Sequence, residues 1–396
     1  LDEDKMYETR RVINVLNGTL FITSKGKMTF VPEHRQKDAA TNILAFEYNP
    51  KTKAPKWSKF LSRVLPDEND QKTLMEFVGY CFMPTHEYET FLYLYGQSGA
   101  NGKSVILDTI KSFFGDDNIS ALQLQQLEGH QLHALTGKIL NIGSEIDKNG
   151  TDKGQIETLK QLVSPGDSVQ INPKNKDPYL LLPNEKPKMA FAGNNKIKQG
   201  VDNAFFRRML LLVFDAEIKD DEKIRGLSNR FKDELSGIFN MALDGLERLI
   251  RQGKFTRSTR MKEELEEYKD EANPLRTFIR EAIIVDKDIM VPGKHIYALY
   301  CAYVGSHGGK PLKDTNFWAK VKDEIASQGT KVEIKQVRVK ADLVGLSDRV
   351  RCAIGIGVNK DFEISSISSD GGNTIVHTST MNLSVKNAVP VEDIDA

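Results

Sequence analysis

Cysteine is scarce in this sequence, with three among 396 residues. Cys81, Cys301 and Cys352 lie far apart, and their spacing matches no paired metal-binding or redox motif. We interpret them as ordinary buried thiols, which fits a reducing, intracellular compartment. The sequence also lacks an apolar run of about 18 residues and a secretory leader with a basic start and an apolar centre. Its composition therefore predicts a soluble protein with no membrane partner.

An excess of one charge sign is also lacking. Lys and Arg together number 55, as do Asp and Glu, so the formal net charge is +0. This balance argues against a generally basic protein, although it leaves room for local nucleic-acid surfaces. The length predicts two or three domains. Because the chain begins with Leu1, we also expect that it is a fragment of a longer protein.

A glycine-rich stretch stands between an apolar run at residues 91–95 and a predicted helix that starts near residue 103. This order is typical of a triphosphate cradle, in which backbone N–H groups, a lysine and a Mg²⁺-binding hydroxyl surround the phosphates. The strict pattern would place its first glycine at 97, where Gln97 stands, so this loop is one residue longer. A plain surface turn is the alternative. The predicted phosphate-binding residues are Gly96, Gly99, Ala100, Asn101, Gly102, Lys103 and Ser104.

Acidic residues follow the next apolar run, at 138–142. An enzyme with such a cradle needs a carboxylate there, which holds Mg²⁺ through water and orients the attacking water. Glu145 is the stronger candidate and Asp147 the weaker. Ser144 precedes Glu145, so one carboxylate would serve both roles, or a water would take one of them. Alternatively, Glu145 does no more than end a strand.

Two later apolar runs have polar neighbours. Asn194 follows the run at 188–192, where its amide would polarise the attacking water beside a γ-phosphate. Asparagine is also a common turn former, which is the alternative for this residue. Arg207 and Arg208 precede the run at 209–214 and suit a finger that reaches the nucleotide of a neighbouring subunit. An ordinary salt bridge is the alternative for the arginines.

Residues 159–179 contain strand-like stretches around a polar turn, which predicts a hairpin with Lys174 and Lys176 at its tip. Two cations there would follow a sugar-phosphate backbone by point-charge contacts. A solvated loop is the alternative.

The pattern of apolar residues changes along the chain. Residues 1–87 combine strand signals at 18–23 and 27–31 with a helical stretch at 70–80, as in a mixed α/β collar domain. Residues 88–252 contain unalternating apolar runs, which predict the buried strands of an α/β sheet, and end in amphipathic helical residues. These runs lie at 91–95, 138–142, 188–192 and 209–214.

The third predicted domain is 253–360. It begins with a charged helix at 260–270, whose acidic run we interpret as a solvated face. Residues 307–360 hold 11 Lys or Arg against 6 Asp or Glu, which favours a DNA-binding surface. The tail, 361–396, is serine-rich and acidic and is predicted to be mobile. A winged-helix-like fold is predicted from helical patterns at 275–284, 295–303 and 316–327 followed by strand-like runs at 331–339 and 349–358.

Taken in order, these motifs resemble the superfamily 3 helicases, specifically the branch of phage and plasmid primase-helicases and the poxvirus D5 group. Residues 99–104 are similar to the cradle of that branch, and residues 163–167 to the segment before its DNA-contacting hairpin. Asn194 corresponds to its sensor asparagine and Arg208, the better candidate of the two arginines, to its finger. The amino-terminal module of the branch is matched at residues 17–20, 48–50, 55–57, 60–61 and 77–80.

The resemblance implies a P-loop, AAA+-like ATPase core. It also implies an ATP-driven homo-oligomeric ring, a hexamer, that moves along single-stranded DNA and separates forked DNA in phage or plasmid replication. ATP and Mg²⁺ would be the cofactors. Lys103 would hold the β- and γ-phosphates, Ser104 the Mg²⁺, Glu145 would orient water and Asn194 would sense the γ-phosphate. Arg208 would act from the adjacent subunit and couple hydrolysis to movement of the hairpins.

Other functions stay open. An initiator or assembly ATPase would bind duplex DNA through the winged-helix-like domain and use nucleotide as a switch, without processive unwinding. A small-molecule P-loop kinase is less well supported, because no arginine-rich lid follows the predicted sheet. Whether a primase or polymerase module precedes Leu1 stays open at this point. The resemblance implies a cytoplasmic location, that of the host if the source is viral.

Overall fold

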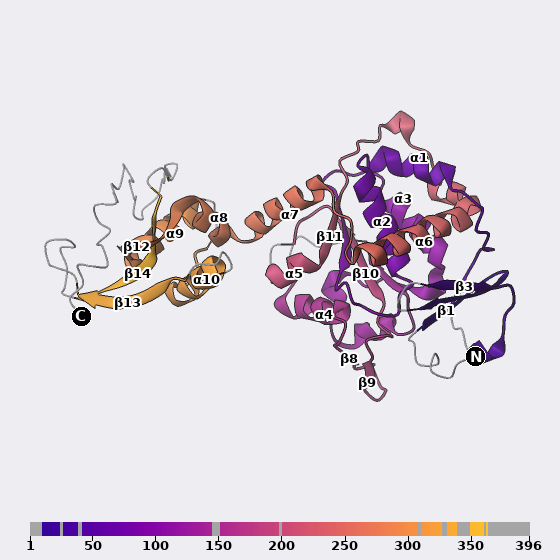
Figure 1. The fold of residues 1–396 in the computed structure, drawn as a ribbon, viewed down its shortest axis with the longest axis horizontal. Coiled ribbons are helices and arrows are strands. Elements are labelled where there is room, and N and C mark those ends of the chain that lie inside the picture. The colour runs from indigo at the N-terminus through magenta and orange to yellow at the C-terminus, as the bar shows by residue number, and fades with distance from the viewer. Residues whose placement is uncertain are drawn as a thin grey trace. The chain divides into compact units, whose positions relative to one another are not determined.

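The computed structural model describes residues 10–23, 27–38, 42–144, 151–197, 200–306, 310–326, 331–338, 349–359 and 362 (Figure 1). The chain divides into two compact units, Leu1–Ala272 and Asn273–Ala396. The domain boundaries predicted after residues 87, 252 and 360 divide the chain differently and stay predictions. The predicted acidic tail, apart from Phe362, lies outside the described residues.

A five-stranded parallel sheet, in the order β11-β5-β10-β7-β6, forms the centre of the first unit. The residues of β5, β7, β10 and β11 are buried along their whole length, which is why the sequence reads as unbroken apolar runs there. The expectation of an α/β sheet is therefore confirmed. The two-residue strand β6 was not predicted, because it is too short to give a pattern. The strands are β5 (Phe91–Tyr95), β6 (Ile119–Ser120), β7 (Leu140–Gly143), β10 (Lys188–Gly193) and β11 (Met209–Val213).

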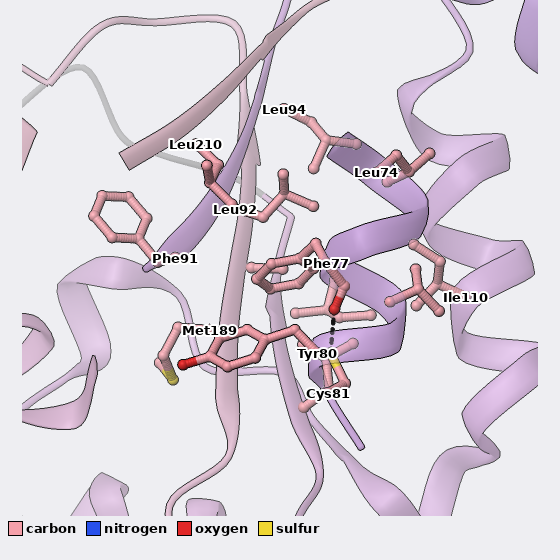
Figure 2. Close-up of a cluster of buried hydrophobic side chains, with 14 of the residues drawn as sticks. Leu74, Phe77, Tyr80, Cys81, Phe91, Leu92, Leu94, Ile110, Met189 and Leu210 are labelled. Carbon is pink, nitrogen blue, oxygen red and sulfur yellow. Dashed lines mark hydrogen bonds between the residues drawn. The ribbon is translucent and has the colours of Figure 1, made fainter. Parts of the chain in front are cut away.

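Helices cover both faces of this sheet, with α2, α3 and α6 on one side and α4 and α5 on the other (Figure 1). Figure 2 shows Leu74 and Phe77 of α2 beside Leu92 of β5 and Ile110 of α3 in the core between helices and sheet. No helix among the described residues is long and apolar enough to cross a membrane. The helices of this unit are α1 (Pro55–Val64), α2 (Glu68–Tyr80), α3 (Lys103–Phe114), α4 (Lys153–Val163), α5 (Asn203–Arg208), α6 (Leu235–Gln252) and α7 (Thr259–Ala272).

Helices α2 and α6 contact each other closely at two glycines. A Cβ atom at Gly79 would lie 2.2 Å from the carbonyl oxygen of Ala242, and one at Gly245 would lie 2.6 Å from that of Met75. Because backbone atoms stand in the way, neither position accepts a larger residue without moving a helix.

A buried carboxylate lies beside this crossing. Glu76 is fully buried, and its oxygens accept hydrogen bonds from Arg248 Nε at 2.6 Å and from Thr256 N at 2.8 Å. A buried carboxylate is stable only when its oxygens are paired in this way. Glu76 therefore connects α2 to α6 and to the segment that follows α6.

The amino-terminal segment forms a second sheet, in the order β3-β2-β1-β4. Strands β1, β2 and β3 are antiparallel, and β4 pairs with β1 in parallel. Inward side chains such as Ile13, Leu20 and Leu44 belong to the same continuous core as the parallel sheet. The segment predicted as a collar therefore packs against the rest of the first unit. Its strands are β1 (Arg10–Val15), β2 (Gly18–Thr23), β3 (Met28–Val31) and β4 (Ile43–Leu44).

The second unit has its own core and a three-stranded antiparallel sheet, in the order β12-β14-β13. The sequence predicted its three helices and two of its strands but missed β12. Residues 283 and 284, predicted as helix, belong to that strand, and the charged residues 286–288 interrupt its apolar pattern where its pairing is irregular. The elements are α8 (Pro274–Ala282), β12 (Ile283–Pro292), α9 (Gly293–Ser306), α10 (Asp314–Ala326), β13 (Glu333–Arg338) and β14 (Arg349–Val358).

Candidate functional site

The glycine-rich loop joins β5, which ends at Tyr95, to α3, which begins at Lys103. The predicted order of strand, loop and helix is therefore present. Gly102 precedes the helix with φ of +93°, a left-handed conformation that favours glycine. A Cβ atom at this position would also lie 2.6 Å from Val64 Cγ1. The first N–H groups of α3 have no partners within the helix, so they are available to a ligand in the loop.

Lys103 and Asn194, 91 residues apart in the sequence, contact each other. Lys103 Nζ donates to Asn194 Oδ1 at 2.9 Å and to the carbonyl oxygen of Gly96 at 2.8 Å. Lys103 is 8% exposed, and burial lowers its pKa from 10.5 to about 8. The two residues meet because β5 and β10 are neighbouring parallel strands, whose carboxyl ends lie at one edge of the sheet.

Asn101 fixes the shape of the loop. It is 3% exposed, and its Nδ2 donates to the carbonyl oxygens of Ser98 at 2.7 Å and Phe214 at 3.3 Å. A Cβ atom at Gly96 would lie 2.6 Å from the backbone carbonyl oxygen of Phe214 and 2.4 Å from Asn101 Nδ2. Glycine is therefore required at 96, although the strict sequence pattern would place it at 97.

An open cavity of about 810 Å³ lies beside the loop. Lys103, Ser104, Asp108 and Lys111 of α3 line it, as does Asn194. Ser104 is exposed, so its hydroxyl is accessible from the cavity. An ammonium, a hydroxyl, an amide and the N–H groups of a helix start together suit an anionic ligand that is rich in oxygen.

The predicted acidic residues, Glu145 and Asp147, lie outside the described residues. Ser144, directly before them in the sequence, lines the cavity. Within the described parts of the chain, no group of three or more His, Cys, Asp or Glu side chains is placed to hold a metal ion. Mg²⁺ needs only one or two protein ligands when phosphate oxygens and waters complete its shell. The exposed hydroxyl of Ser104 is suited to be one of these protein ligands.

Arg207 and Arg208 end helix α5 in different surroundings. Arg208 is 9% exposed, and its guanidinium pairs with Glu89 at 2.5 Å and donates to the carbonyl oxygen of Ala204 at 3.1 Å. The side chain of Arg207 is 66% exposed, and its Nη2 lies 3.6 Å from Glu89 Oε2. Neither arginine lines the cavity beside the loop. Within one chain Arg208 is thus held in a salt bridge, whereas Arg207 is open to solvent.

The predicted hairpin forms, with β8 (Val169–Ile171) antiparallel to β9 (Tyr179–Leu181). Lys174 and Lys176 are exposed in the turn between the strands. The hydroxyl of Tyr179 forms hydrogen bonds with His133 Nδ1 at 2.8 Å and with Thr136 Oγ1 at 2.5 Å. The hairpin is therefore attached through Tyr179, in the strand pair next to the turn, while the turn itself is exposed.

Sequence reasoning missed the buried lysine that holds the segment before the hairpin. Lys186 is 1% exposed, and its Nζ donates to the carbonyl oxygens of Gln161 at 3.0 Å, Ser164 at 2.6 Å and Asp167 at 2.7 Å. Burial lowers the pKa of Lys186 to about 8. No local pattern reveals this role, because the partners are backbone groups 19 to 25 residues away.

The loop that follows β10 is held by helix α7. The side chain of Lys196 is 6% exposed and pairs with Glu264 at 2.9 Å and Glu271 at 2.6 Å. The hydroxyl of Tyr268, also in α7, accepts a hydrogen bond from Ile197 N. The interpretation of the acidic run at 260–270 as a solvated face therefore does not hold for Glu264; Glu271 lies just beyond that predicted helix. Their partner lies on a distant strand end, which a local charge pattern does not show.

Two family models match the chain. Residues 1–66 match the family described as D5 N terminal like. Residues 94–208, which contain the loop, Asn194 and both arginines, match a family of unknown function, DUF5906. The first match confirms, for these amino-terminal residues, the resemblance to the D5 group that the motifs indicated. No curated protein matches the chain in sequence.

Solved structures also match the chain. The A form apo structure of the NrS-1 C-terminal region has a TM-score of 0.50 and 12% sequence identity, and the match covers 88% of this chain and 97% of that chain. At this identity the comparison shows a common fold. Two further apo structures of the same region have TM-scores of 0.48 and 0.45, with identities of 13% and 12%. They cover 88% and 90% of this chain and 96% and 98% of the other.

Proposed function

We propose that the chain is an ATP-hydrolysing DNA helicase of phage or plasmid replication. The contact between Lys103 Nζ and Asn194 Oδ1 carries this proposal, because a phosphate-binding lysine and a γ-phosphate sensor must reach the same phosphate. The D5-like match of the amino-terminal residues supports the replication context.

In this proposal the glycine-rich loop is a P-loop, and the parallel sheet with its helices is an AAA+-like core. Lys103 would bind the β- and γ-phosphates of ATP, and Asn194 would exchange its contact with Lys103 for one with the γ-phosphate. Ser104 would hold Mg²⁺, which neutralises negative charge on the phosphates. Glu145, or less directly Asp147, would hold the ion through water and orient the attacking water.

The two arginines would act at the interface between subunits of a ring. Arg207 is exposed, so in this proposal it would extend toward phosphates bound to a neighbouring copy. Arg208 is fixed by Glu89, so in this chain it would position the end of α5. The resemblance favours Arg208 as the finger, whereas exposure favours Arg207 for direct contact. We propose the pair as one unit, with Arg207 reaching outward.

Two parts of the chain would contact DNA. The hairpin tip presents Lys174 and Lys176 to a single strand. The second unit has the element order of a winged helix, three helices with an antiparallel sheet, in which α10 would enter the major groove. Exposed Lys313, Lys320 and Lys322 supply positive charge at this helix.

Strand separation on forked DNA tests this function. With ATP and Mg²⁺ the unaltered chain should release the labelled strand, and Lys103→Ala should neither hydrolyse ATP nor release the strand. Lys262→Ala, which removes an exposed lysine of α7, is the matched control and should behave as the unaltered chain. ATP hydrolysis at an unchanged rate in Lys103→Ala would contradict the phosphate-binding role.

Subunit mixing tests the ring. Lys103→Ala subunits and Arg207→Ala subunits, each inactive alone, should recover part of the ATPase activity when mixed, because one intact interface can form. The mass in solution, measured with a non-hydrolysable ATP analogue and forked DNA, should be that of a hexamer. A stable monomer under these conditions would contradict the ring.

A DNA-binding initiator or assembly ATPase is the second candidate function. The winged-helix element order of the second unit favours it, since that fold suits duplex DNA. Nucleotide-dependent binding of duplex DNA without strand release from a fork would support this function over the helicase.

A further inference from the structure

A second cavity, of about 720 Å³, borders the same glycine-rich loop. Ala100, Asn101 and Ser104 line both cavities, so the two meet at the loop. One wall of the second cavity is attached directly to the loop, since Ile218 N donates to the carbonyl oxygen of Ala100 at 3.3 Å. A ligand whose charged end lies in the loop can therefore extend into this second cavity.

Apolar side chains from two segments form the walls. Helix α1 contributes one wall, and the segment 218–231 contributes the other. Phe60 and Phe231 contact each other across this boundary, with ring centroids 5.5 Å apart. Ile224 is 46% exposed, so a ligand that covers it gains apolar contact. The apolar residues that these two segments contribute are Phe60, Val64, Ile218, Ile224, Leu227 and Phe231.

Cations surround these apolar walls. The cationic residues of the lining are Lys56, Lys59, Arg63, Lys223, Arg225 and Arg230. Glu222 is the one acidic residue among the described lining residues, and its carboxylate accepts from Arg63 at 3.0 Å and from Lys219 N at 3.2 Å. The cavity therefore suits a flat apolar group that carries negative charge at one end.

We propose that this cavity binds the nucleoside half of the triphosphate whose phosphates lie in the glycine-rich loop; the proposal rests on the proposed function. The apolar walls contact the faces of the base, and the cations lie near the phosphate next to the sugar. A single DNA strand carries similar groups, but the lining shared with the phosphate site favours the nucleotide's own base. Because α1 lies within the D5-like residues 1–66, that module forms part of the nucleotide site.

Comparing the affinities for two ligands distinguishes the contribution of the base from that of the phosphates. The intact chain should bind a non-hydrolysable ATP analogue with Mg²⁺ at least about tenfold more tightly than inorganic tripolyphosphate, by calorimetry. The double variant Ile224→Asn, Leu227→Asn should lose about tenfold in affinity for the analogue and none for tripolyphosphate. Ile43→Asn, at a position 48% exposed and outside the cavity, is the matched control and should change neither.

The Lys103→Ala variant distinguishes a failure of the base subsite from a failure of the proposed function, because it should weaken the binding of both ligands. If Lys103→Ala weakens both and the double variant leaves the analogue unaffected, the base subsite is overturned and the phosphate site stands. If Lys103→Ala weakens neither, the proposed function fails. If the intact chain binds neither ligand, both proposals fail.

Photolabelling locates the base directly. The 8-azido analogue of ATP carries its reactive group on the base, so irradiation should label residues within 56–64 or 218–231, and ATP should prevent it. Labelling confined to other segments would overturn the proposal. Protection by a single-stranded oligonucleotide but not by ATP would assign the cavity to nucleic acid and would also overturn it.

Discussion

The affinity of this chain for ATP should fall as the pH rises above about 8. Lys103 is 8% exposed, and no salt bridge to it is present among the described residues, so desolvation lowers its pKa from 10.5 to about 8. That shift corresponds to roughly 3 kcal/mol against the charged form. A bound triphosphate places negative charge beside Nζ and raises the pKa again.

The sign of the effect follows from these two pKa values. Below about pH 8 the lysine is charged with and without nucleotide, so this group makes no contribution to the pH dependence. At higher pH, up to its pKa in the complex, binding takes up a proton and the Kd should rise by up to about tenfold per pH unit. Calorimetry in two buffers of different ionisation enthalpy should show proton uptake that grows from about zero near pH 7 toward about one near pH 9.5.

Lys103→Arg is the control, because a guanidinium stays charged throughout this range. The affinity of the Lys103→Arg variant for ATP should be nearly independent of pH. Asp108 and Lys111, which line the same cavity, are present in both proteins, so any effect of theirs would be seen in both. A Kd of the unaltered chain that is constant to about pH 9.5 would refute the reasoning. An equal slope in Lys103→Arg would assign the titration to another group.

The remaining predictions concern stability and DNA binding. Glu76→Ala should lower the free energy of unfolding by about 3–5 kcal/mol in chemical denaturation, because it breaks a buried ionic network. Glu89→Gln should lower it by only about 1 kcal/mol, since Glu89 is 36% exposed, although Arg208 loses its anionic partner. Lys174→Ala with Lys176→Ala should reduce the salt slope for single-stranded DNA by about 1.4, two contacts at about 0.7 each, by fluorescence anisotropy.

Matched variants serve as controls. Glu68→Ala, on the exposed side of α2, should cost under about 0.5 kcal/mol, and a similarly small loss for Glu76→Ala would contradict its role. Glu87→Gln, which removes an exposed carboxylate nearby, should be close to neutral, and a loss equal to that of Glu89→Gln would argue against the ion pair. Replacing the exposed Lys254 and Lys262 by alanine should leave the salt slope of DNA binding unchanged. If the hairpin variant also keeps the slope of the unaltered chain, the turn with Lys174 and Lys176 is a solvated loop that does not bind DNA.

Local sequence patterns predicted the strands that are buried on both faces. The runs at 91–95, 188–192 and 209–214 are unbroken because both faces of β5, β10 and β11 pack against the core. The same patterns predicted that Lys103 and Asn194 each follow a buried strand of the α/β sheet, and the structure shows that these two strands are parallel neighbours. Strand β12 was missed because charged residues 286–288 break its apolar pattern.

Contacts between distant residues could not be predicted in this way. Nothing in the sequence around Lys196 indicates that it pairs with carboxylates of α7. Likewise, nothing around Arg208 indicates that it pairs with Glu89, which is 119 residues away in the sequence. Such pairs depend on how strands and helices come together, which single-sequence periodicity does not encode. The predicted carboxylates Glu145 and Asp147 lie outside the described residues, so they stay predictions.

The loop after β10 is anchored at two points that are two residues apart. Asn194 accepts a hydrogen bond from Lys103, and Lys196 lies between carboxylates of α7. Two residues of fully extended chain span only about 7 Å, so the loop has little slack. A ligand that moved Asn194 away from Lys103 would therefore also strain the contacts of Lys196 with α7, which ends the described part of the first unit.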